Sequence, residues 1–400
     1  MKKPEVLSPA GNLEKLKFAV EYGADAVYLG GKIFNLRERA GNFSLEEMEE
    51  GIDYAHSRGK KVYVTLNAFA RNRDFKELLS YVKELATLKP DAFIVSDLGV
   101  LSLVREVASD IDVHVSTQAN ITNYKAVELL RTLGVKRVVL ARELSVDEIS
   151  EIKERVPEIE LEVFVHGAMC MAYSGRCLLS DYLSHRASNK GACSQSCRWK
   201  YYVVEEKRPG EYYELEEDGK GTYIFNSKDL CALPLLPELV DAGVDSLKIE
   251  GRVKSSYYVA LVTSVYRKAV DLLFESRQKF SEQLSFLMEE LGKVSHRPYT
   301  LGFLSSDGSL KQHYETSSYI RDYKFLAVFD GNYWDVRNQF SIGDIVEVFQ
   351  PGVEVQRLKV ESITNDSGKE VETVHPNYKV TISFDRPVRV SRNAILRKRK

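Results

Sequence analysis

Short apolar runs alternate with amphipathic stretches along about the first 270 residues of the chain. In the amphipathic stretches apolar residues recur every three or four positions, which predicts helices, and glycine often ends them, as at Gly23, Gly59 and Gly134. The apolar runs are EVLSPAG, DAVYLGG, KVYVTLNAF, DAFIVSD, DVHVSTQANI, KRVVLAREL, LEVFVHG and DSLKIEGR. Apolar strands that alternate with helices predict a parallel sheet buried on both faces.

Eight strand–helix units predict a TIM-like (β/α)8 barrel over residues 1–275. A doubly wound open sheet is the alternative, disfavoured because no glycine-rich phosphate loop follows the first strand. An insertion of about residues 167–230 follows the seventh strand. Part of it alternates like a β-hairpin with a turn near Pro209-Gly210, and residues 223–226 are a candidate for a ninth strand.

The pattern changes in the last third of the chain. Residues 276–322 combine a helical stretch with a polar, turn-rich crossing. From residue 323 to 400, short strands alternate with Gly, Asn and Asp, which predicts a small C-terminal all-β barrel domain. We therefore expect a barrel domain with a cysteine-bearing insertion, a helical linker and a second, smaller barrel.

Composition is ordinary for a soluble globular protein, with 44% apolar and 28% charged residues. No stretch resembles a membrane span or a signal peptide, so we expect no membrane association and a reducing, cytoplasmic location. The net charge of −2 argues against nucleic-acid binding by bulk charge. The basic C-terminal residues 385–400 are either a solvated tail or an edge that contacts phosphate.

The cysteines are clustered. Four of the five lie at Cys170, Cys177, Cys193 and Cys197, spaced C-x6-C-x15-C-x3-C, and Cys231 follows at the predicted start of the seventh helix. Clustered thiols in a chain without a secretory leader indicate metal or redox chemistry rather than disulfides. The six-residue first gap is unlike that of common structural zinc sites, whereas an iron–sulfur cluster needs four thiolates. The spacing leaves an iron–sulfur cluster, zinc, and unligated or redox thiols open.

Polar residues at the strand ends would ring the carboxyl-terminal mouth of the barrel, where barrel enzymes keep their chemistry. Together they suit an anionic ligand, because guanidinium groups bind carboxylates in a bidentate way. His166 with Cys170 could instead form a nucleophile pair. Neither H-E-x-x-H nor G-x-S-x-G is present. The strand-end residues are Arg37, Arg39, Asn67, Asp97, Ser116, Gln118, Asn120, Arg142, Glu143, His166, Glu250, Arg252 and Lys254.

Several segments resemble the collagenase-like peptidase family of unclassified catalytic type. They are EVFVHGAMCMAYSGRCLLS, PEVLSPAGNLEKLKFAVEYGADAVYLGG, FNLRERAGNF, NKGACSQSCR and KIEGRVKS. The crossing RPYTLGF, followed by a small β domain, is similar to the branch of that family that hydroxylates tRNA. The resemblance implies a TIM-like barrel, formation of 5-hydroxyuridine at the tRNA wobble position and dependence on prephenate.

The resemblance also implies a 4Fe–4S cluster held by Cys170, Cys177, Cys193 and Cys231, whereas spacing alone would include Cys197 and omit Cys231. The implied partners are tRNA and prephenate or another small dicarboxylate. We expect catalytic roles for His166, Glu250 and Arg252, and substrate binding by Arg37, Arg39, Asn67, Gln118, Arg142 and Lys254. The alternatives are a peptidase of the same family and a zinc-bearing RNA-binding scaffold.

Overall fold

The computed structural model describes most of the chain. The described residues are 2–36, 41–169, 173–186, 193–194, 196, 228–305 and 319–400, with the backbone of 202–204 and 212–214.

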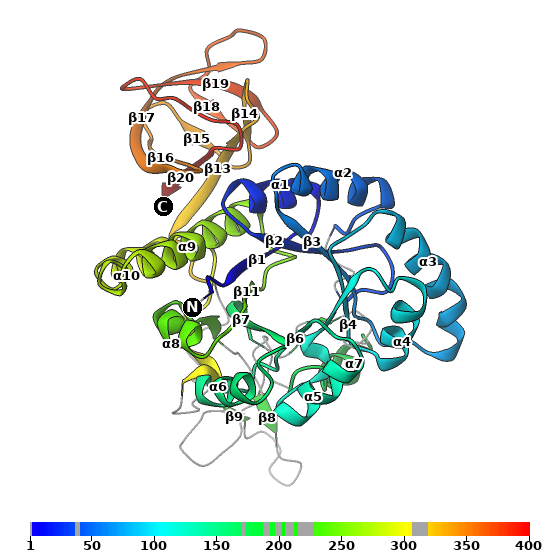
Figure 1. Ribbon diagram of the computed structural model, residues 1–400. Helices are drawn as coiled ribbons and strands as arrows, with labels where there is room; N and C mark the ends of the chain where they lie inside the picture. The colour runs from blue at the N-terminus through cyan, green and yellow to red at the C-terminus, as the bar shows by residue number, and fades with distance from the viewer. Residues whose placement is uncertain are drawn as a thin grey trace.

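Eight parallel strands close into a barrel, as predicted (Figure 1). The eighth strand pairs with both the first and the seventh, which closes the ring. Their buried positions are almost continuous, as expected for strands covered on both faces. The strands are β1 (Glu5–Pro9), β2 (Ala26–Gly30), β3 (Lys61–Leu66), β4 (Ala92–Val95), β5 (Asp112–Val115), β6 (Arg137–Val139), β7 (Glu160–Ala168) and β11 (Ser246–Ile249).

Helices surround this ring, and polar side chains fix where they begin. Asn12, Ser44 and Ser145 each accept a hydrogen bond from the backbone N–H three residues on. The predicted stops at Gly23, Gly59 and Gly134 have positive φ. The helices are α1 (Leu13–Glu21), α2 (Leu45–His56), α3 (Phe75–Thr87), α4 (Leu98–Val107), α5 (Tyr124–Thr132), α6 (Val146–Arg155), α8 (Leu236–Asp241) and α9 (Ser256–Glu275).

The insertion begins at the carboxyl end of β7. It holds α7 (Leu179–Ser184) and the predicted hairpin, β8 (Tyr202–Val204) paired with β9 (Tyr212–Glu214). Cys231, expected at the start of a helix, instead ends β10 (Asp229–Cys231), which runs antiparallel to β7. That prediction was wrong because Asp229–Cys231 extends the barrel sheet before α8 begins. The ninth-strand candidate, 223–226, lies outside the described residues.

A helix and a short strand connect the barrel to the C-terminal domain. The helix α10 (Arg277–Leu291) packs against α9, and β12 (Tyr299–Thr300) pairs with β10. The domain itself is a closed antiparallel barrel, as predicted, with Trp334 and Val346 in its own core. Its strands are β13 (Tyr323–Phe329), β14 (Trp334–Val336), β16 (Ile345–Gln350), β17 (Val353–Asn365), β19 (Lys379–Phe384) and β20 (Ile395–Arg399), beside the pair β15 (Phe340–Ser341) and β18 (Thr373–Val374).

The basic C-terminal stretch is not a frayed tail. Its last residues, Ile395–Arg399, form β20, which pairs with both β13 and β16. Arg397 has no exposed surface, and Lys398 pairs with Asp344 at 2.6 Å. The interpretation as a solvated tail was therefore wrong for these residues, because strand pairing and ion pairing order them.

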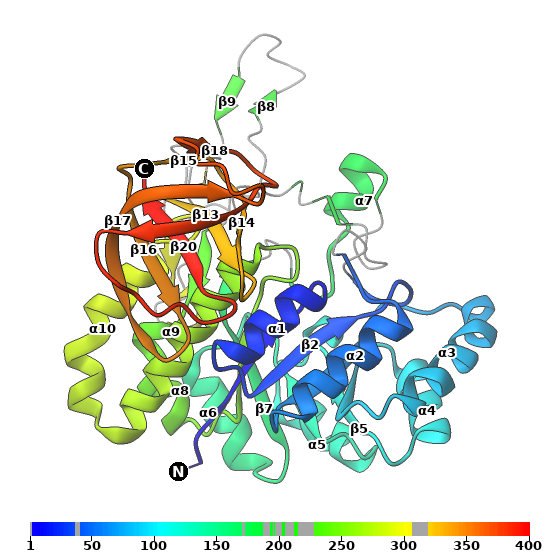
Figure 2. The ribbon, with the colours of Figure 1, turned by 90° about the horizontal axis from the view of Figure 1, so that it is seen from above.

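The two barrels pack against each other through α1, α9 and α10. Tyr22, just after α1, donates to the carbonyl oxygens of Phe349 at 3.0 Å and Asn393 at 2.9 Å. Figure 2 shows α7, β8 and β9 at the end of the large barrel opposite the N-terminus, with the small barrel against its side. Among the described helices, none is long and apolar enough to cross a membrane.

Candidate active site

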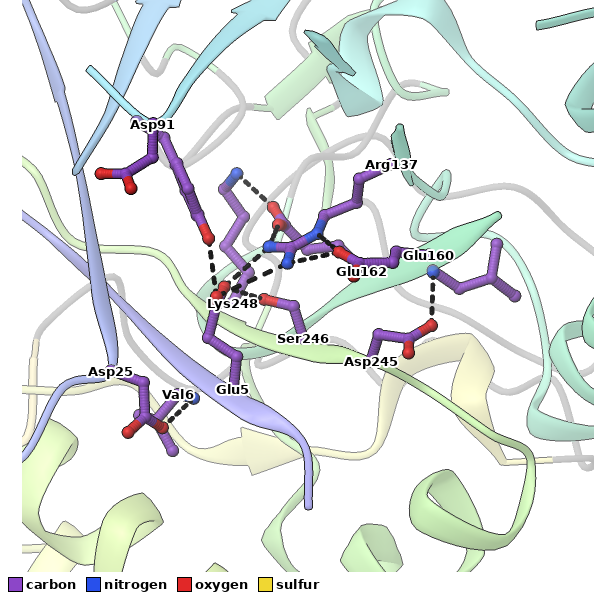
Figure 3. Close-up of polar contacts among 12 residues, drawn as sticks. Glu5, Val6, Asp25, Asp91, Arg137, Glu160, Glu162, Asp245, Ser246 and Lys248 are labelled. Carbon is purple, nitrogen blue, oxygen red and sulfur yellow. Dashed lines mark hydrogen bonds and ion pairs between the residues drawn. The ribbon is translucent and has the colours of Figure 1, made fainter. Parts of the chain in front are cut away.

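An ion network fills the amino-terminal end of the large barrel (Figure 3). Arg137 lies 2.7 Å from Glu5, 2.7 Å from Glu160 and 3.1 Å from Glu162, and Lys248 lies 2.5 Å from Glu162. Burial alone would raise the pKa of Glu160, but the charge of Arg137 holds that pKa below its ordinary value. These paired charges join β1, β6, β7 and β11. These ion pairs thus stabilise the amino-terminal end of the barrel. The candidate site is at the opposite, carboxyl-terminal end.

Two predicted site residues, Arg142 and Glu250, lie together with Phe164 in the mouth. Arg142, just after β6, lies 3.7 Å from Glu250, which follows β11. Its guanidinium stands 4.0 Å from the ring centre of Phe164 on β7. Stacking on an aromatic face orients a guanidinium and leaves its charge intact. This group can therefore present a cation, a carboxylate and an aromatic edge to a ligand.

Arg252 reaches across the mouth and is 2% exposed. Its guanidinium donates to the side-chain oxygens of Asn42 at 2.6 Å and Asn35 at 3.3 Å, and to the Thr65 hydroxyl at 3.5 Å. A Cβ atom on Gly30 would lie 2.5 Å from this guanidinium, so any larger residue there would displace the Arg252 side chain. Arg252 therefore ties the loop after β2 to β3 and to the end of β11.

His166 lies on the outer side of the barrel wall. Its ring faces Tyr266 and Tyr258 of α9, with centroids 5.6 and 6.0 Å away, and Tyr299 at 5.3 Å. Burial lowers the pKa of His166 to about 3, so its ring is neutral.

A register irregularity places His166 there. Lys248 pairs with Phe164, whereas the next residue, Ile249, pairs with His166, so Val165 is an extra residue in β7. Such a bulge breaks the alternation of faces. Phe164 consequently faces the mouth while the His166 ring faces α9, so the structure does not bring that ring together with the side chains of Glu250 and Arg142.

The other predicted ligand-binding residues are distributed around the rim. Asn67 accepts a hydrogen bond from the Leu36 N–H at 3.2 Å, which holds the loop after β2. Lys254 stands over the ring of Tyr319 at 4.7 Å. Arg37 and Arg39 lie outside the described residues.

Hydrogen bonds hold the start of the insertion against the rim of the barrel mouth. Ser174 accepts a hydrogen bond from the Arg142 N–H at 3.3 Å, and its own N–H donates to Glu143 at 2.9 Å. Gly175 has φ +75°, and a Cβ atom there would lie 1.9 Å from the carbonyl oxygen of Gln118. The loops after β5 and β6 thus hold the segment that leads to Cys177.

The described cysteines fit a shared metal centre only in part. Cys177 and Cys193 lie on segments joined by a hydrogen bond of 2.9 Å from the Ser194 N–H to the Ser180 hydroxyl. Cys231 instead packs toward α9 and α10, 4.0 Å from the Tyr266 hydroxyl and 3.8 Å from the Met288 sulfur.

Burial raises the pKa of the Cys231 thiol to about 11, which favours a thiol over a metal-binding thiolate. Among the described residues, no three His, Cys, Asp or Glu side chains are placed to hold one metal ion. Cys170 and Cys197 lie outside the described residues, so the predicted ligand set stays a prediction.

Sequence reasoning missed the partners that organise the mouth. Sequence reasoning selected Arg37 and Arg39 in FNLRERAGNF. The asparagines that flank them, Asn35 and Asn42, are the residues that bind Arg252. Phe164 was counted only as an apolar strand residue. Their position beside strand ends was the available signal, but apolar and amide residues are common there.

Comparison with known proteins gives two family matches that together span most of the chain. The profile of "Peptidase family U32" matches residues 11–313, and that of "Peptidase family U32 C-terminal domain" matches residues 321–397. The boundary between these matches falls before β13, where the small barrel begins.

Curated relatives match over nearly the same length. "tRNA hydroxylation protein P1" of Bacillus subtilis is 42% identical over 97% of this chain and 93% of its own. "tRNA hydroxylation protein P" of Escherichia coli is 41% identical over 88% of this chain and 87% of its own. "23S rRNA 5-hydroxycytidine C2501 synthase" of Escherichia coli is 35% identical over 76% of this chain and 45% of its own.

Proposed function

Since this chain belongs to peptidase family U32, we propose that it is an RNA-modifying enzyme that hydroxylates a uridine of tRNA. The observation that carries the proposal is the 42% identity, over 97% of the chain, to a protein named for tRNA hydroxylation. The expected product is 5-hydroxyuridine at the wobble position. A wobble base lies in a single-stranded loop, so it can be unstacked into a pocket at small energetic cost.

The mouth supports this proposal through Arg142, Glu250 and Phe164. Arg142 can bind a carboxylate of prephenate or of another small dicarboxylate in a bidentate way. Glu250, 3.7 Å from Arg142, is the carboxylate that we assign to accept a proton from the bound base. Arg252 is a positioning residue, because its guanidinium holds Asn42 and Asn35.

His166 takes a supporting role in this proposal. It packs against Tyr266 and Tyr299 behind the wall that carries Phe164. Replacing it would shift that wall and the adjacent Glu250, whose N–H donates to the His166 carbonyl at 2.9 Å. We propose that it acts on the reaction through this contact.

Hydroxylation is tested in Escherichia coli cells that lack their own tRNA hydroxylation protein. Expression of this chain should raise 5-hydroxyuridine-derived nucleosides in bulk tRNA above the empty-vector level, measured by mass spectrometry. Glu250→Gln should return them to that level, since an amide cannot accept the proton. Soluble protein without any rise above the empty vector would reject the proposal.

Prephenate dependence is tested in desalted extract of the same cells. Adding prephenate should restore hydroxylation of unmodified tRNA, and succinate, a dicarboxylate of different shape, should not. Equal activity without any addition would remove prephenate from the proposal.

We further propose a 4Fe–4S cluster held by Cys170, Cys177, Cys193 and Cys231, which would supply electron transfer or a Lewis-acidic iron beside the mouth. Cys231 would have to turn away from Tyr266 to join it. Protein purified without air should contain iron and sulfide, and Cys231→Ser should lose them while Cys197→Ser keeps them. Zinc without sulfide would favour the scaffold alternative.

Peptidase activity is the second candidate, because the family profile carries that description. It would use His166 with Cys170. His166 is 1% exposed and surrounded by tyrosines, so a peptide could reach it only after the wall opened. Cleavage of gelatin by purified protein that is lost in His166→Ala, and that is unaffected by removing iron, would favour the peptidase.

A further inference from the structure

The short helix α7 in the insertion carries its large apolar side chains on the outside. Leu178, its N-cap residue, is 69% exposed, and Tyr182, four residues on, is 83% exposed. The Tyr182 N–H donates to the Leu178 carbonyl at 2.9 Å, so the two side chains are neighbours on one face of the helix. Leu183 is exposed as well. We call the surface of Leu178 and Tyr182 the outer face of α7.

The serines of α7 are turned inward instead. Ser180 is buried, and its hydroxyl accepts a hydrogen bond from the Ser194 N–H at 2.9 Å. The Ser184 hydroxyl donates to the Ser194 hydroxyl at 2.7 Å. A surface helix ordinarily buries its apolar side and exposes its polar side. In α7 this order is reversed, which is typical of a helix whose outer face receives a partner.

Hydrogen bonds hold the segment that leads to α7 at the mouth. Residues 173–176 form a turn, in which the Arg176 N–H donates to the Tyr173 carbonyl at 2.9 Å. Ser174, within this turn, is bonded to Arg142 and Glu143. Figure 2 shows α7 at the same end of the large barrel as the mouth. A ligand that enters the mouth with only one of its parts can therefore extend over α7.

The charge of this part of the insertion favours an anionic partner. Residues 173–200 contain five Lys and Arg residues and one acid, Asp181, in a chain whose net charge is −2. Exposed Arg176 is one of the five, and Tyr173 and Tyr182 lie among them. Aromatic rings beside cations bind single-stranded nucleic acid, because the rings stack on bases and the cations contact phosphates. The following residues, 201–227, have seven acids and three cations, which confines such a contact to the first part of the insertion.

We propose that the outer face of α7 binds the tRNA anticodon loop, with an unpaired base stacked on Tyr182 and Arg176 in contact with a phosphate. This inference rests on the proposed function and adds the surface that holds the RNA outside the mouth. A wobble base that leaves the stacked loop to enter the mouth uncovers its neighbours. The Tyr182 ring covers the face of one of them, and Leu178 packs beside it.

Tyr182→Ala and Tyr182→Phe test the stacking contact. The probe is an unmodified anticodon stem-loop RNA with uridine at the wobble position, and fluorescence anisotropy measures its affinity for the whole chain. Tyr182→Ala should weaken binding by about tenfold, the scale of base–aromatic stacking, whereas Tyr182→Phe keeps the ring and should stay within about twofold. Tyr378→Ala is the matched control, because this tyrosine is also exposed but lies on the small barrel. It should stay within about twofold.

Stem-loops that lack one base identify what the ring contacts. In these second probes an abasic residue stands directly 5′ or directly 3′ of the wobble uridine. One of the two should bind wild-type protein more weakly than the intact stem-loop does. For that probe, Tyr182→Ala should weaken binding by less than about twofold further, because two groups in contact give non-additive losses.

Arg176→Gln tests the phosphate contact through salt dependence. The slope of log affinity against log salt concentration should become shallower by about 0.7–1, since one phosphate fewer is neutralised. Arg155→Gln is the control, because Arg155 is an exposed residue at the end of α6, just before β7 begins. It should leave the slope unchanged.

Unchanged affinity for the intact stem-loop in Tyr182→Ala would overturn the inference and favour a protein partner on this face. So would an equal loss for the intact and both abasic stem-loops in a variant that is correctly folded by circular dichroism. An unchanged slope in Arg176→Gln would remove the phosphate contact. Failure of the proposed function gives a different result, because the wild type would then bind the stem-loop through Tyr182 without raising 5-hydroxyuridine in cells.

Discussion

Arg397 on β20 of the small barrel lies 2.8 Å from Glu290 on α10 of the large domain. The same guanidinium lies 2.8 Å from Glu347 on β16 and donates to the Tyr257 hydroxyl of α9 at 3.3 Å. Burial opposes the charge of Arg397, but its anionic neighbours raise the pKa further above the ordinary value. A buried ion group thus fixes the orientation of the two barrels.

Arg397→Gln should destabilise the protein by about 1–3 kcal/mol, because it leaves Lys293 as the one cation that still pairs with both Glu290 and Glu347 among the described residues. The measurement is urea unfolding followed by circular dichroism. Arg399→Gln, two residues along the same strand and exposed, is the control and should change the free energy of unfolding by less than about 0.5 kcal/mol. Equal effects of the two variants would show that the buried contact is unimportant.

Stability should fall when the pH is lowered from about 5 to about 3. Burial alone would raise the pKa of Glu290, but Arg397 and Lys293 hold it below its ordinary value. A carboxyl group with a lowered folded-state pKa stabilises the protein above its unfolded pKa of about 4.3, and this contribution is lost as it protonates. The decline should be shallower in Arg397→Gln and unchanged in Arg399→Gln, measured as thermal unfolding across the pH series.

Gly175→Ala should lower hydroxylation by tenfold to a hundredfold, because small displacements of a positioned site are costly. The added Cβ atom would lie 1.9 Å from the Gln118 carbonyl oxygen and push the insertion off the rim. Gly352→Ala is the control, with φ +68° but no heavy atom within 4 Å of the new Cβ. It should cost about 1 kcal/mol of stability and leave activity intact. Normal activity in Gly175→Ala would mean that this contact does not position the site.

In metal-free protein, Cys231 should react with iodoacetamide far more slowly than Cys177 and Cys193. Cys231 is 2% exposed beneath α9 and α10, whereas the other two thiols are partly exposed. Peptide mass spectrometry after brief labelling would measure this order, and urea-unfolded protein should label all three alike. Fast labelling of Cys231 in the folded protein would indicate that it readily leaves its packed position.

The sequence predicted the large barrel because its strands are read from local patterns. Runs such as KVYVTLNAF and DAFIVSD are mostly apolar, without the alternation of a half-buried strand, and parallel strands buried on both faces show that pattern. The sequence also predicted helix ends at glycines, because Gly23 and Gly134 take a backbone conformation that other residues rarely adopt. The small barrel followed from its turn residues in the same way.

The sequence indicated only part of the candidate site. Strand ends drew attention to Arg142 and Glu250, and the structure places them 3.7 Å apart because the carboxyl ends of all barrel strands meet at one mouth. His166 belongs to the same class of position, but one extra residue in β7 turned it toward α9. A bulge depends on how two strands pair, so neither strand alone reveals it.

By itself, the sequence determined the two barrels, the insertion and the ring of polar residues at the strand ends, because each depends on the order of apolar and polar residues along the chain. Tertiary structure decided which way His166 and Cys231 face, and that Arg397 is buried between the domains. These features arise from contacts between residues far apart in the sequence. Local patterns carry no information about such partners, and packing alone selects them.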